Sequence, residues 1–169
     1  MNKAKPPLKF KIVTMTQDFA EEIATWNYPD PYSIYSLSSH VIPILMNPSN
    51  AYFAVVSREG ILVGYCCFCA EARVMGGDYS KDQNSVVDVG VGMRPEITGQ
   101  GLGKSFVSAI LDYAQKRYRP GSVRVTIAEF NKRSLRTFQS LGFNETFRFV
   151  RSGDELEFVQ LERLSNLDS

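Results

Sequence analysis

The chain has 169 residues, of which 44% are hydrophobic, 12% aromatic and 22% charged. Domains usually run ~100–200 residues, so the length predicts one domain over residues 1–169, and the apolar content excludes a disordered chain. The 19 Lys and Arg residues nearly balance the 18 Asp and Glu residues, which leaves a net charge of +1. This balance excludes a strongly basic nucleic-acid-binding protein.

The cysteines and the N-terminus indicate where the protein works. Cys66, Cys67 and Cys69 lie together inside an apolar run, whereas a disulfide framework needs pairs spread along the chain. A zinc site would need a second group of ligands, and the only histidine is His40, so we expect no metal. Residues 1–7 are polar and predict a frayed start, without a signal peptide or membrane span. We therefore expect a cytoplasmic protein.

Periodicity and turn residues divide the first half of the chain into elements. Alternation of apolar and polar residues indicates strands, helical spacing indicates helices, and prolines and glycines mark the breaks. The predicted elements are a strand over Leu8–Val13, a helix from Thr16 to Trp26, a short helix over Ile34–Leu45, a hairpin of Tyr52–Val56 and Ile61–Cys69, a loop over 71–84 and a strand over Ser85–Met93. Gly90 and Gly92 in the last strand indicate a bulge or a close backbone approach.

The second half predicts two helices and three strands. These are a helix over Gly101–Arg117, a strand over Val123–Ile127, a helix over Ser134–Leu141, and strands over Glu145–Val150 and Glu155–Leu161. The short turns in the middle of the chain favour antiparallel neighbours. We therefore predict an α/β (α+β) fold with a mixed, mostly antiparallel sheet flanked by helices.

A glycine-rich loop between a predicted strand and a predicted helix carries the clearest chemical signal. Three alternating glycines let the backbone approach a ligand, and the helix start supplies unpaired N–H groups and the positive end of its dipole. This combination indicates an anion site, most naturally for a phosphate or pyrophosphate. The alternative is a flexible surface turn. The candidate binding residues are Gly99, Gln100, Gly101, Leu102, Gly103 and Lys104.

Two common phosphate-binding motifs nearly match this loop. A Walker A loop would need glycine where Thr98 stands, and a dinucleotide fingerprint would need glycine where Lys104 stands. Both motifs also expect a parallel sheet early in the fold, whereas this loop follows three strands that we predict to be antiparallel. A P-loop kinase is therefore the least favoured interpretation.

Two segments resemble motifs of the GNAT superfamily of N-acetyltransferases, and the resemblance runs over nearly the whole chain. The loop Thr98–Gly103 is similar to the family signature (Q/R)-x-x-G-x-(G/A), and Met93–Glu96 before it is similar to the family's V-x-P-x approach. About thirty residues later, Asn131–Phe143 is similar to N-x-x-(A/S)-x-x-x-Y-x-x-x-G-F. Two motifs in this order are far more specific than either alone.

The resemblance implies a sheet of about seven strands, splayed between the fourth and the fifth, that binds acetyl-CoA as acetyl donor. It places the pantetheine arm along Val91, Gly92 and Met93, where a backbone N–H group would polarise the thioester carbonyl. In the second motif it assigns coenzyme A contacts to Asn131, Ser134 and Phe138.

Three positions depart from the family pattern. Thr98 replaces the signature Gln or Arg, which removes a side chain but leaves the backbone cradle. Phe138 replaces the frequent general-acid tyrosine. Thr126 stands where the ribosomal-protein alanine acetyltransferases carry a glutamate base.

The candidate catalytic bases are therefore two other carboxylates, Asp88 and Glu129. A primary alkyl amine has a pKa of ~10 and must lose a proton before it attacks. Asp88 lies where several family members carry a strand carboxylate, although it could be an ordinary exposed carboxylate. Glu129 ends a predicted strand, two residues before Asn131.

The aromatic segment that follows the first predicted helix resembles the acceptor side of bacterial family members. Trp26, Tyr28 and Tyr32 are the candidate substrate-binding residues. The alternative is that these rings pack a loop onto the core.

The implied function is an N-acetyltransferase that moves an acetyl group from acetyl-CoA to a primary amine of a small molecule, peptide or protein by direct attack. The alternative is a catalytically weak or inactive acyl-CoA-binding or sensing module, which Phe138 and Thr126 favour. We expect no nucleic-acid or membrane partner. A homodimer stays open because a late β-hairpin can form a dimer edge.

Overall fold

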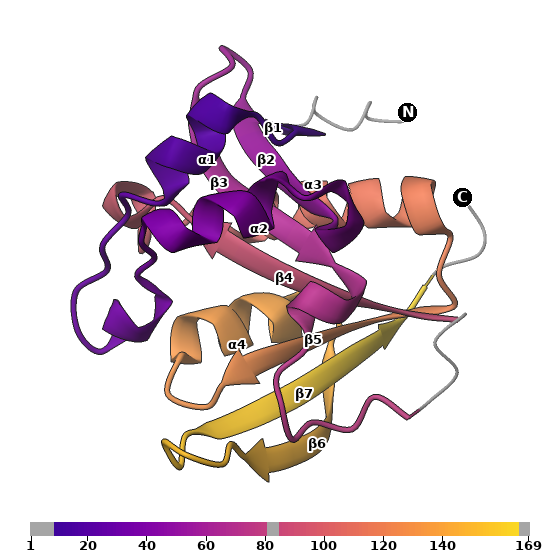
Figure 1. The fold of residues 1–169 in the computed structure, drawn as a ribbon. Helices are drawn as coiled ribbons and strands as arrows, with labels where there is room; N and C mark the ends of the chain where they lie inside the picture. The colour runs from indigo at the N-terminus through magenta and orange to yellow at the C-terminus, as the bar shows by residue number, and fades with distance from the viewer. Residues whose placement is uncertain (1–8, 81–84, 166–169) are drawn as a thin grey trace, which may run out of the picture.

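The computed structural model describes residues 9–80 and 85–165. Three predictions fall partly or wholly outside these ranges: the frayed start at residues 1–7, the first residue of the first strand, and the last residues of the loop predicted over 71–84. Within the described ranges, the chain forms one mixed sheet with helices on both faces (Figure 1).

Seven strands form the sheet in the order β1-β2-β3-β4-β5-β7-β6. Among the described residues, β4 and β5 are the parallel pair, and the other neighbours run antiparallel. The mixed, mostly antiparallel fold predicted from the sequence is confirmed. The strands are β1 (Phe10–Thr14), β2 (Tyr52–Ser57), β3 (Leu62–Phe68), β4 (Val86–Met93), β5 (Ser122–Ala128), β6 (Asn144–Val150) and β7 (Glu157–Leu164).

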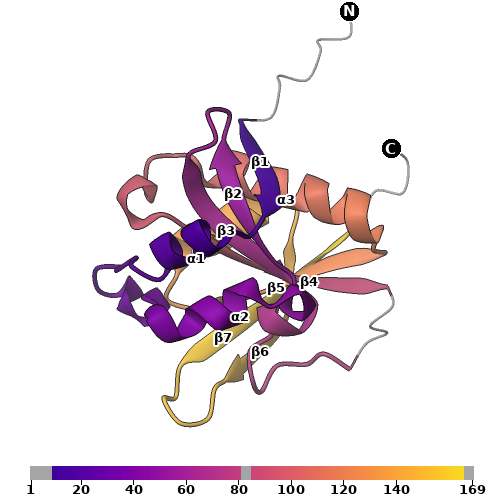
Figure 2. The same cartoon turned by 45° about the horizontal axis from the view of Figure 1, so that its top comes forward.

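Helices cover the two faces of the sheet in pairs. The pairs are α1 (Gln17–Ile23) with α2 (Ile42–Met46), and α3 (Gly103–Tyr118) with α4 (Lys132–Ser140). Figures 1 and 2 show α1 and α2 side by side over one face, where they bury a small core with β2 and β3. The larger core lies on the other face, where α3 and α4 pack against the inward side chains of β1 to β5 and β7.

The parallel ladder between β4 and β5 is short. It runs from Val86↔Ser122 to Asp88↔Arg124, although both strands continue beyond it. The rest of β4 pairs only on its other side, with β3, from Phe68↔Val89 to Gly64↔Met93. The two strands therefore separate after Asp88, which is the splay that the resemblance implies.

Gly90 and Gly92 make room for side chains of the neighbouring strand and do not form a bulge. The β3–β4 register is regular through both positions. A Cβ atom at Gly90 would lie 2.7 Å from Cys67 Sγ, and one at Gly92 would lie 2.4 Å from the Tyr65 ring. The close-approach alternative was therefore right and the bulge was wrong.

The helix predicted over Ile34–Leu45 is wrong in its extent. The segment forms two 3-10 turns, Tyr32–Tyr35 and Ser39–Val41, before α2 begins at Ile42. Pro43 explains the late start, because proline is accommodated in the first turn of a helix but not in its interior. The first of these turns holds Tyr32 and Tyr35 against Phe130, two residues after the end of β5.

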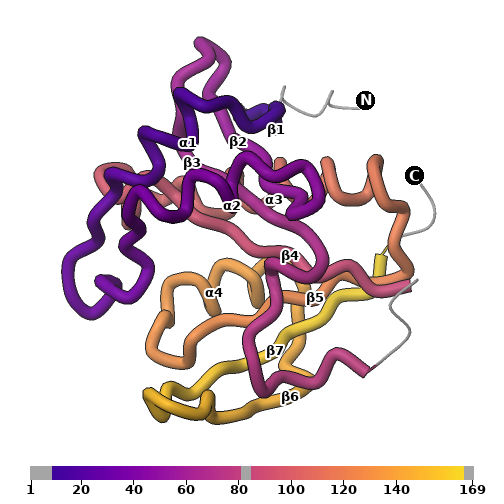
Figure 3. Tube along the Cα trace, in the orientation of Figure 1, coloured from indigo at the N-terminus to yellow at the C-terminus, as the bar shows by residue number. Residues whose placement is uncertain are grey.

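The segment after β3 crosses the sheet surface and is held there by side chains from below. After the 3-10 turn Cys69–Ala72, the chain runs over β5 and β7 (Figure 3). The buried Gln160 amide accepts from the Asp78 N–H group at 2.7 Å and donates to the Asp78 carbonyl at 3.1 Å. This surface segment is therefore anchored to the sheet by side chains of β5 and β7.

Candidate functional site

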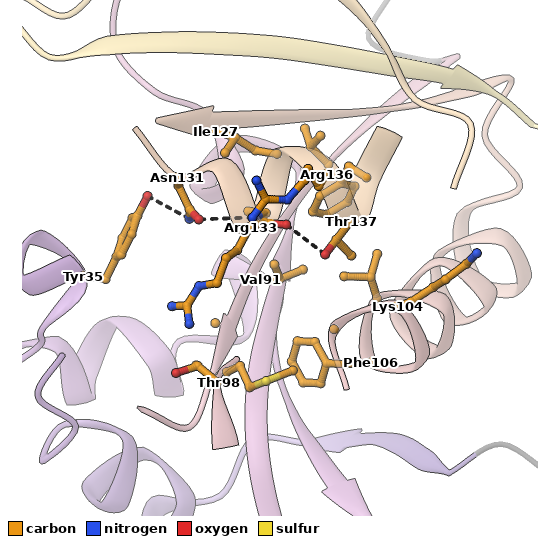
Figure 4. A pocket seen from close by; sticks show the side chains of 18 of the residues that line it. Tyr35, Val91, Thr98, Lys104, Phe106, Ile127, Asn131, Arg133, Arg136 and Thr137 are labelled. Atoms are coloured by element: carbon orange, nitrogen blue, oxygen red, sulfur yellow. Dashed lines mark hydrogen bonds between the residues drawn. The ribbon is translucent and has the colours of Figure 1, made fainter. Parts of the chain in front are cut away.

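A cavity of about 530 Å³ opens where β4 and β5 separate. Its lining combines the ends of β4 and β5, the loop before α3, the first turn of α3, most of α4, and tyrosines of the α1–α2 side (Figure 4). The cavity thus passes from one face of the sheet to the other through the splay.

The glycine loop forms one end of this cavity. Gly99 and Gly101 have φ values of +74° and +77°, a left-handed conformation that glycine adopts without strain. Leu102, the N-cap residue of α3, makes no side-chain capping hydrogen bond, so the first N–H groups of the helix are left to a ligand. The result is a backbone cradle suited to an anion.

Cationic side chains surround this cradle. Lys104 of α3 and Arg133 and Arg136 of α4 line the cavity. Arg133 extends from α4 toward the loop: a Cβ atom at Gly99 would lie 2.9 Å from its Nη1. The guanidinium also lies 4.3 Å from the centre of the Tyr32 ring, so Arg133 lies between the glycine loop and this tyrosine.

The open edge of β4 presents backbone groups to the cavity. The Arg94 N–H group donates to the Val63 carbonyl of β3 at 2.8 Å. Because successive residues of a strand direct their backbone groups to opposite edges, those of Val91 and Met93 face the splay. The Tyr28 hydroxyl confirms this direction, since it donates to the Met93 carbonyl at 2.5 Å.

Tyrosines line the other end of the cavity, on the α1–α2 side. They are Tyr28, Tyr32, Tyr35 and Tyr65. Burial raises the pKa of Tyr28, Tyr35 and Tyr65 above the usual value, so these phenols stay protonated at neutral pH. They can donate hydrogen bonds, but they cannot act as bases there.

Asp88 does not lie in the lining of this cavity. Its carboxylate is 1% exposed and accepts from Arg124 Nε at 2.6 Å, from Arg124 Nη2 at 2.9 Å and from Arg73 Nε at 2.9 Å. Both carboxylate oxygens are engaged by guanidinium groups and closed off from the cavity, so an acceptor bound there does not reach them. Its position corrects the catalytic assignment made from the sequence, and we do not retain Asp88 as a base.

Glu129 also lies elsewhere. It lines a second, smaller hollow with Lys132 and Arg148, and its carboxylate pairs with the Lys132 ammonium. That hydrogen bond lowers the pKa of Glu129, so the group is ionised and engaged at the surface. Both carboxylates proposed from the sequence are therefore separated from the cavity.

Most other predicted site residues come together. Those that line the cavity are Val91, Gly92, Met93, Gly99, Gly101, Gly103, Lys104, Asn131, Ser134 and Phe138, with Tyr28 and Tyr32 at the far end. Gln100 and Leu102 do not; the Gln100 amide donates to the Glu96 carbonyl at 3.0 Å. Trp26 is 4% exposed and lies in the smaller core, where its ring centre is 6.2 Å from that of Tyr65, so it is a core residue.

The cysteines offer no nucleophile to the cavity. Cys66 and Cys67 are buried, and burial raises the pKa of the Cys67 thiol to about 12. The thiolate, not the thiol, is the nucleophile. This arrangement favours direct attack by an acceptor over a covalent enzyme intermediate. In the described part of the chain, three or more His, Cys, Asp or Glu side chains nowhere gather into a metal-binding group.

A sequence model described as the acetyltransferase (GNAT) family matches residues 16–143, which include the whole cavity lining. The chain belongs to the GNAT acetyltransferase family. No curated protein matches the sequence.

Solved structures agree with this GNAT fold. A GNAT-family acetyltransferase from Bacillus anthracis superposes with a TM-score of 0.71 at 17% identity, over 92% of this chain and 95% of the other. A chimera of the Vibrio cholerae spermidine N-acetyltransferase SpeG and hSSAT gives 0.70 at 14% identity, over 92% and 95%. At these identities, the likeness shows the fold alone.

In this GNAT protein the cradle fits the pyrophosphate of coenzyme A. The two left-handed glycines, the uncapped start of α3 and the three nearby cations are the donors that such an anion needs. Coenzyme A would supply the activated thioester, with its pantetheine arm along the open edge of β4. The Thr98 hydroxyl donates a hydrogen bond to the nearby Pro95 carbonyl at 2.8 Å.

Sequence reasoning missed several lining residues. Arg133 and Arg136 flank Ser134 in the second motif, and their charge could have indicated an anion site. Tyr65 gave no such signal, because it occupies an ordinary strand position, whereas Thr126 was noted only as a departure from the family's glutamate base. Only the splay brings Thr126 to the cavity.

Among the described residues, no helix has both the length and the apolar character that crossing a bilayer requires.

Proposed function

We propose that this GNAT protein is an N-acetyltransferase that uses acetyl-CoA to acetylate a primary amine by direct attack. The observation that carries the proposal is the continuous cavity through the splay, with an anion cradle at one end and tyrosines at the other. Such a cavity can hold a donor and an acceptor at the same time and bring their reacting atoms together.

The residues of the chain divide the work along this cavity. The cradle and the cations of α3 and α4 bind the pyrophosphate, and the open edge of β4 holds the arm that follows. A backbone N–H group of Val91 or Met93 donates to the thioester carbonyl and stabilises the negative charge that develops there. The tyrosines line the part of the cavity in which the acceptor binds.

The experiment that tests the proposal measures thiol release from acetyl-CoA with a panel of amines. The panel contains small polyamines, amino acids, peptide N-termini and aminoglycoside-type antibiotics. We expect turnover with at least one class and tight acetyl-CoA binding by calorimetry. Absence of acetyl-CoA binding would overturn the proposal.

The lining also predicts which amines react best. Among the described residues, the cavity lining carries Lys104, Arg133 and Arg136 but no Asp or Glu. With no carboxylate to accept its proton, an amine reacts in proportion to its neutral fraction. An α-amine, with a pKa of ~8, is neutral far more often near pH 7 than an alkyl amine with a pKa of ~10.

We therefore expect kcat/KM near pH 7 to be about 100-fold higher for a peptide α-amine than for spermidine, the acceptor in the name of one structural neighbour. The check is kcat/KM from pH 7 to 10 for both amines. Each should rise about tenfold per pH unit up to the pKa of its own amine. A spermidine rate that is high and flat near pH 7 would contradict this prediction and reveal a protein base.

The second candidate is an acyl-CoA-binding or sensing module with little or no catalysis. Phe138 favours it, because this buried ring lies in the cavity lining where the family's acid is frequently a tyrosine. Tight acetyl-CoA binding without turnover on any amine would support this second candidate. A Phe138→Tyr variant that then gained turnover would identify the missing group.

Three further expectations belong to the proposal. One domain would carry the whole activity, and buried, unpaired Cys66 and Cys67 support a reducing, cytoplasmic location. The β6–β7 hairpin at the end of the sheet would form the contact in a homodimer. Sedimentation of the purified protein, with and without acetyl-CoA, measures the oligomeric state.

A further inference from the structure

Two hydroxyl groups contact each other beside the splay, one from the surface segment after β3 and one from the sheet. Tyr79 belongs to the segment that crosses the sheet surface, and Thr126 belongs to β5. Their oxygens are 2.8 Å apart. Thr126 lines the cavity and Tyr79 does not, so Tyr79 reaches the cavity only through Thr126.

Either oxygen can donate in this hydrogen bond, and the neighbours of the two groups favour Tyr79 as the donor. The Val74 N–H group donates to the Tyr79 oxygen at 2.8 Å. The phenol proton then needs an acceptor, and Thr126 Oγ1 provides it. With Tyr79 as donor, the proton of Thr126 is directed away from Tyr79 and is available to the cavity. A hydroxyl that accepts one hydrogen bond also becomes a stronger donor.

Tyr79 is held firmly in this position. The guanidinium of Arg124 lies 4.8 Å from the centre of its ring and that of Arg73 lies 5.4 Å from it. Both arginines are anchored by the buried Asp88. The adjacent residue, Asp78, is bound through its backbone to Gln160 of β7. The phenol therefore cannot follow Thr126 if that side chain turns, and it fixes the Thr126 rotamer.

We infer that Thr126 is a second hydrogen-bond donor to the thioester carbonyl, from β5, and that Tyr79 is the positioning residue that orients it. The first donor is the backbone N–H group of β4, so the carbonyl oxygen would be held from both sides of the splay. No proton is transferred in this role; the hydrogen bond strengthens as negative charge develops on the oxygen. The inference rests on the proposed function, because it requires acetyl-CoA in this cavity.

A direct test observes the carbonyl itself, without turnover. Acetyl-CoA labelled with carbon-13 at the carbonyl is bound to the protein, and the chemical shift of that carbon is measured by NMR. We expect a downfield shift on binding to the wild type, a loss of part of it in Thr126→Val and Tyr79→Phe, and its retention in Thr126→Ser. Dissociation constants for acetyl-CoA should stay within about twofold, since one donor among many contacts is removed.

Kinetics with the best acceptor should follow the same order. We expect kcat to fall about 100-fold in Thr126→Val and about tenfold in Tyr79→Phe, with KM for acetyl-CoA nearly unchanged. Thr14→Val on β1 and Tyr113→Phe on α3 are matched controls, because both remove a hydroxyl outside the cavity lining. Both controls should behave as the wild type.

The outcomes separate the inference from the proposed function. An unchanged carbonyl shift in Thr126→Val, with acetyl-CoA bound, would overturn the role of Thr126 while leaving the acetyltransferase proposal intact. A loss confined to Thr126→Val would overturn the positioning role of Tyr79. A wild type that does not bind acetyl-CoA overturns both.

Discussion

Replacing Gly101 with leucine is expected to lower the affinity for coenzyme A about 1000-fold while the protein stays folded. Two effects act together. The φ of +77° becomes strained for a residue with a Cβ atom, and the new side chain occupies the approach to the cradle. Losing two charge-assisted hydrogen bonds to the pyrophosphate accounts for a loss of this size. Calorimetric titration with coenzyme A measures it.

Gly60 provides the matched control for backbone strain. Its φ is +81°, a Cβ atom there would meet nothing within 4 Å, and it lies in the β2–β3 turn outside the cavity lining. Gly101 likewise has open space around its Cβ position. Gly60→Leu should therefore show a similar loss of thermal stability and normal affinity for coenzyme A. Equal affinity in the two variants would contradict the cradle.

Replacing Asp88 with alanine is expected to lower the free energy of unfolding by about 3–5 kcal/mol. The carboxylate and the Arg124 side chain are both nearly inaccessible to water, so the substitution leaves an uncompensated buried charge. This loss is large beside a total stability of about 5–15 kcal/mol for a typical domain. Urea unfolding followed by tryptophan fluorescence measures it.

Two comparisons make the Asp88 experiment specific. Asp154→Ala breaks an exposed ion pair with Arg151 and should change stability much less. The double variant Asp88→Ala/Arg124→Leu removes both buried charges and should recover part of the loss. An Asp88→Ala variant with normal stability and a shifted pH–rate profile would restore the carboxylate as the general base.

The sequence predicted the elements well, and it located the glycine loop that lines one end of the cavity, because both signals are local. Alternation and helical spacing depend on neighbouring residues, and the glycine cradle is continuous from Gly99 to Gly103. The short helix was misplaced where Pro43 outweighed the apolar pattern. Strand ends differed by a few residues, as in β7, which begins at Glu157.

The acceptor end was poorly predicted because it depends on contacts between distant segments. Asp88 looked like a free strand carboxylate until Arg73 and Arg124, 15 and 36 residues away, closed around it. The sequence suggested Trp26 as a substrate-binding residue, whereas its ring packs in the smaller core. Nothing local in the sequence indicates that Tyr79 meets Thr126, since 47 residues separate them.

The short β4–β5 ladder has a consequence for how the molecule holds together. Among the described residues, backbone pairing joins β1–β4 to β5–β7 over a short stretch, from the Ser85 carbonyl, which accepts from the Gly121 and Ser122 N–H groups, to Asp88↔Arg124. Side-chain packing of α3 and α4 also bridges the two blocks. A molecule in the splay would contact both blocks, so its binding energy adds to their association. Bound acetyl-CoA would then connect the two blocks across the sheet. Backbone amide hydrogens of β4 and β5 beside the splay would exchange more slowly with solvent when it is bound.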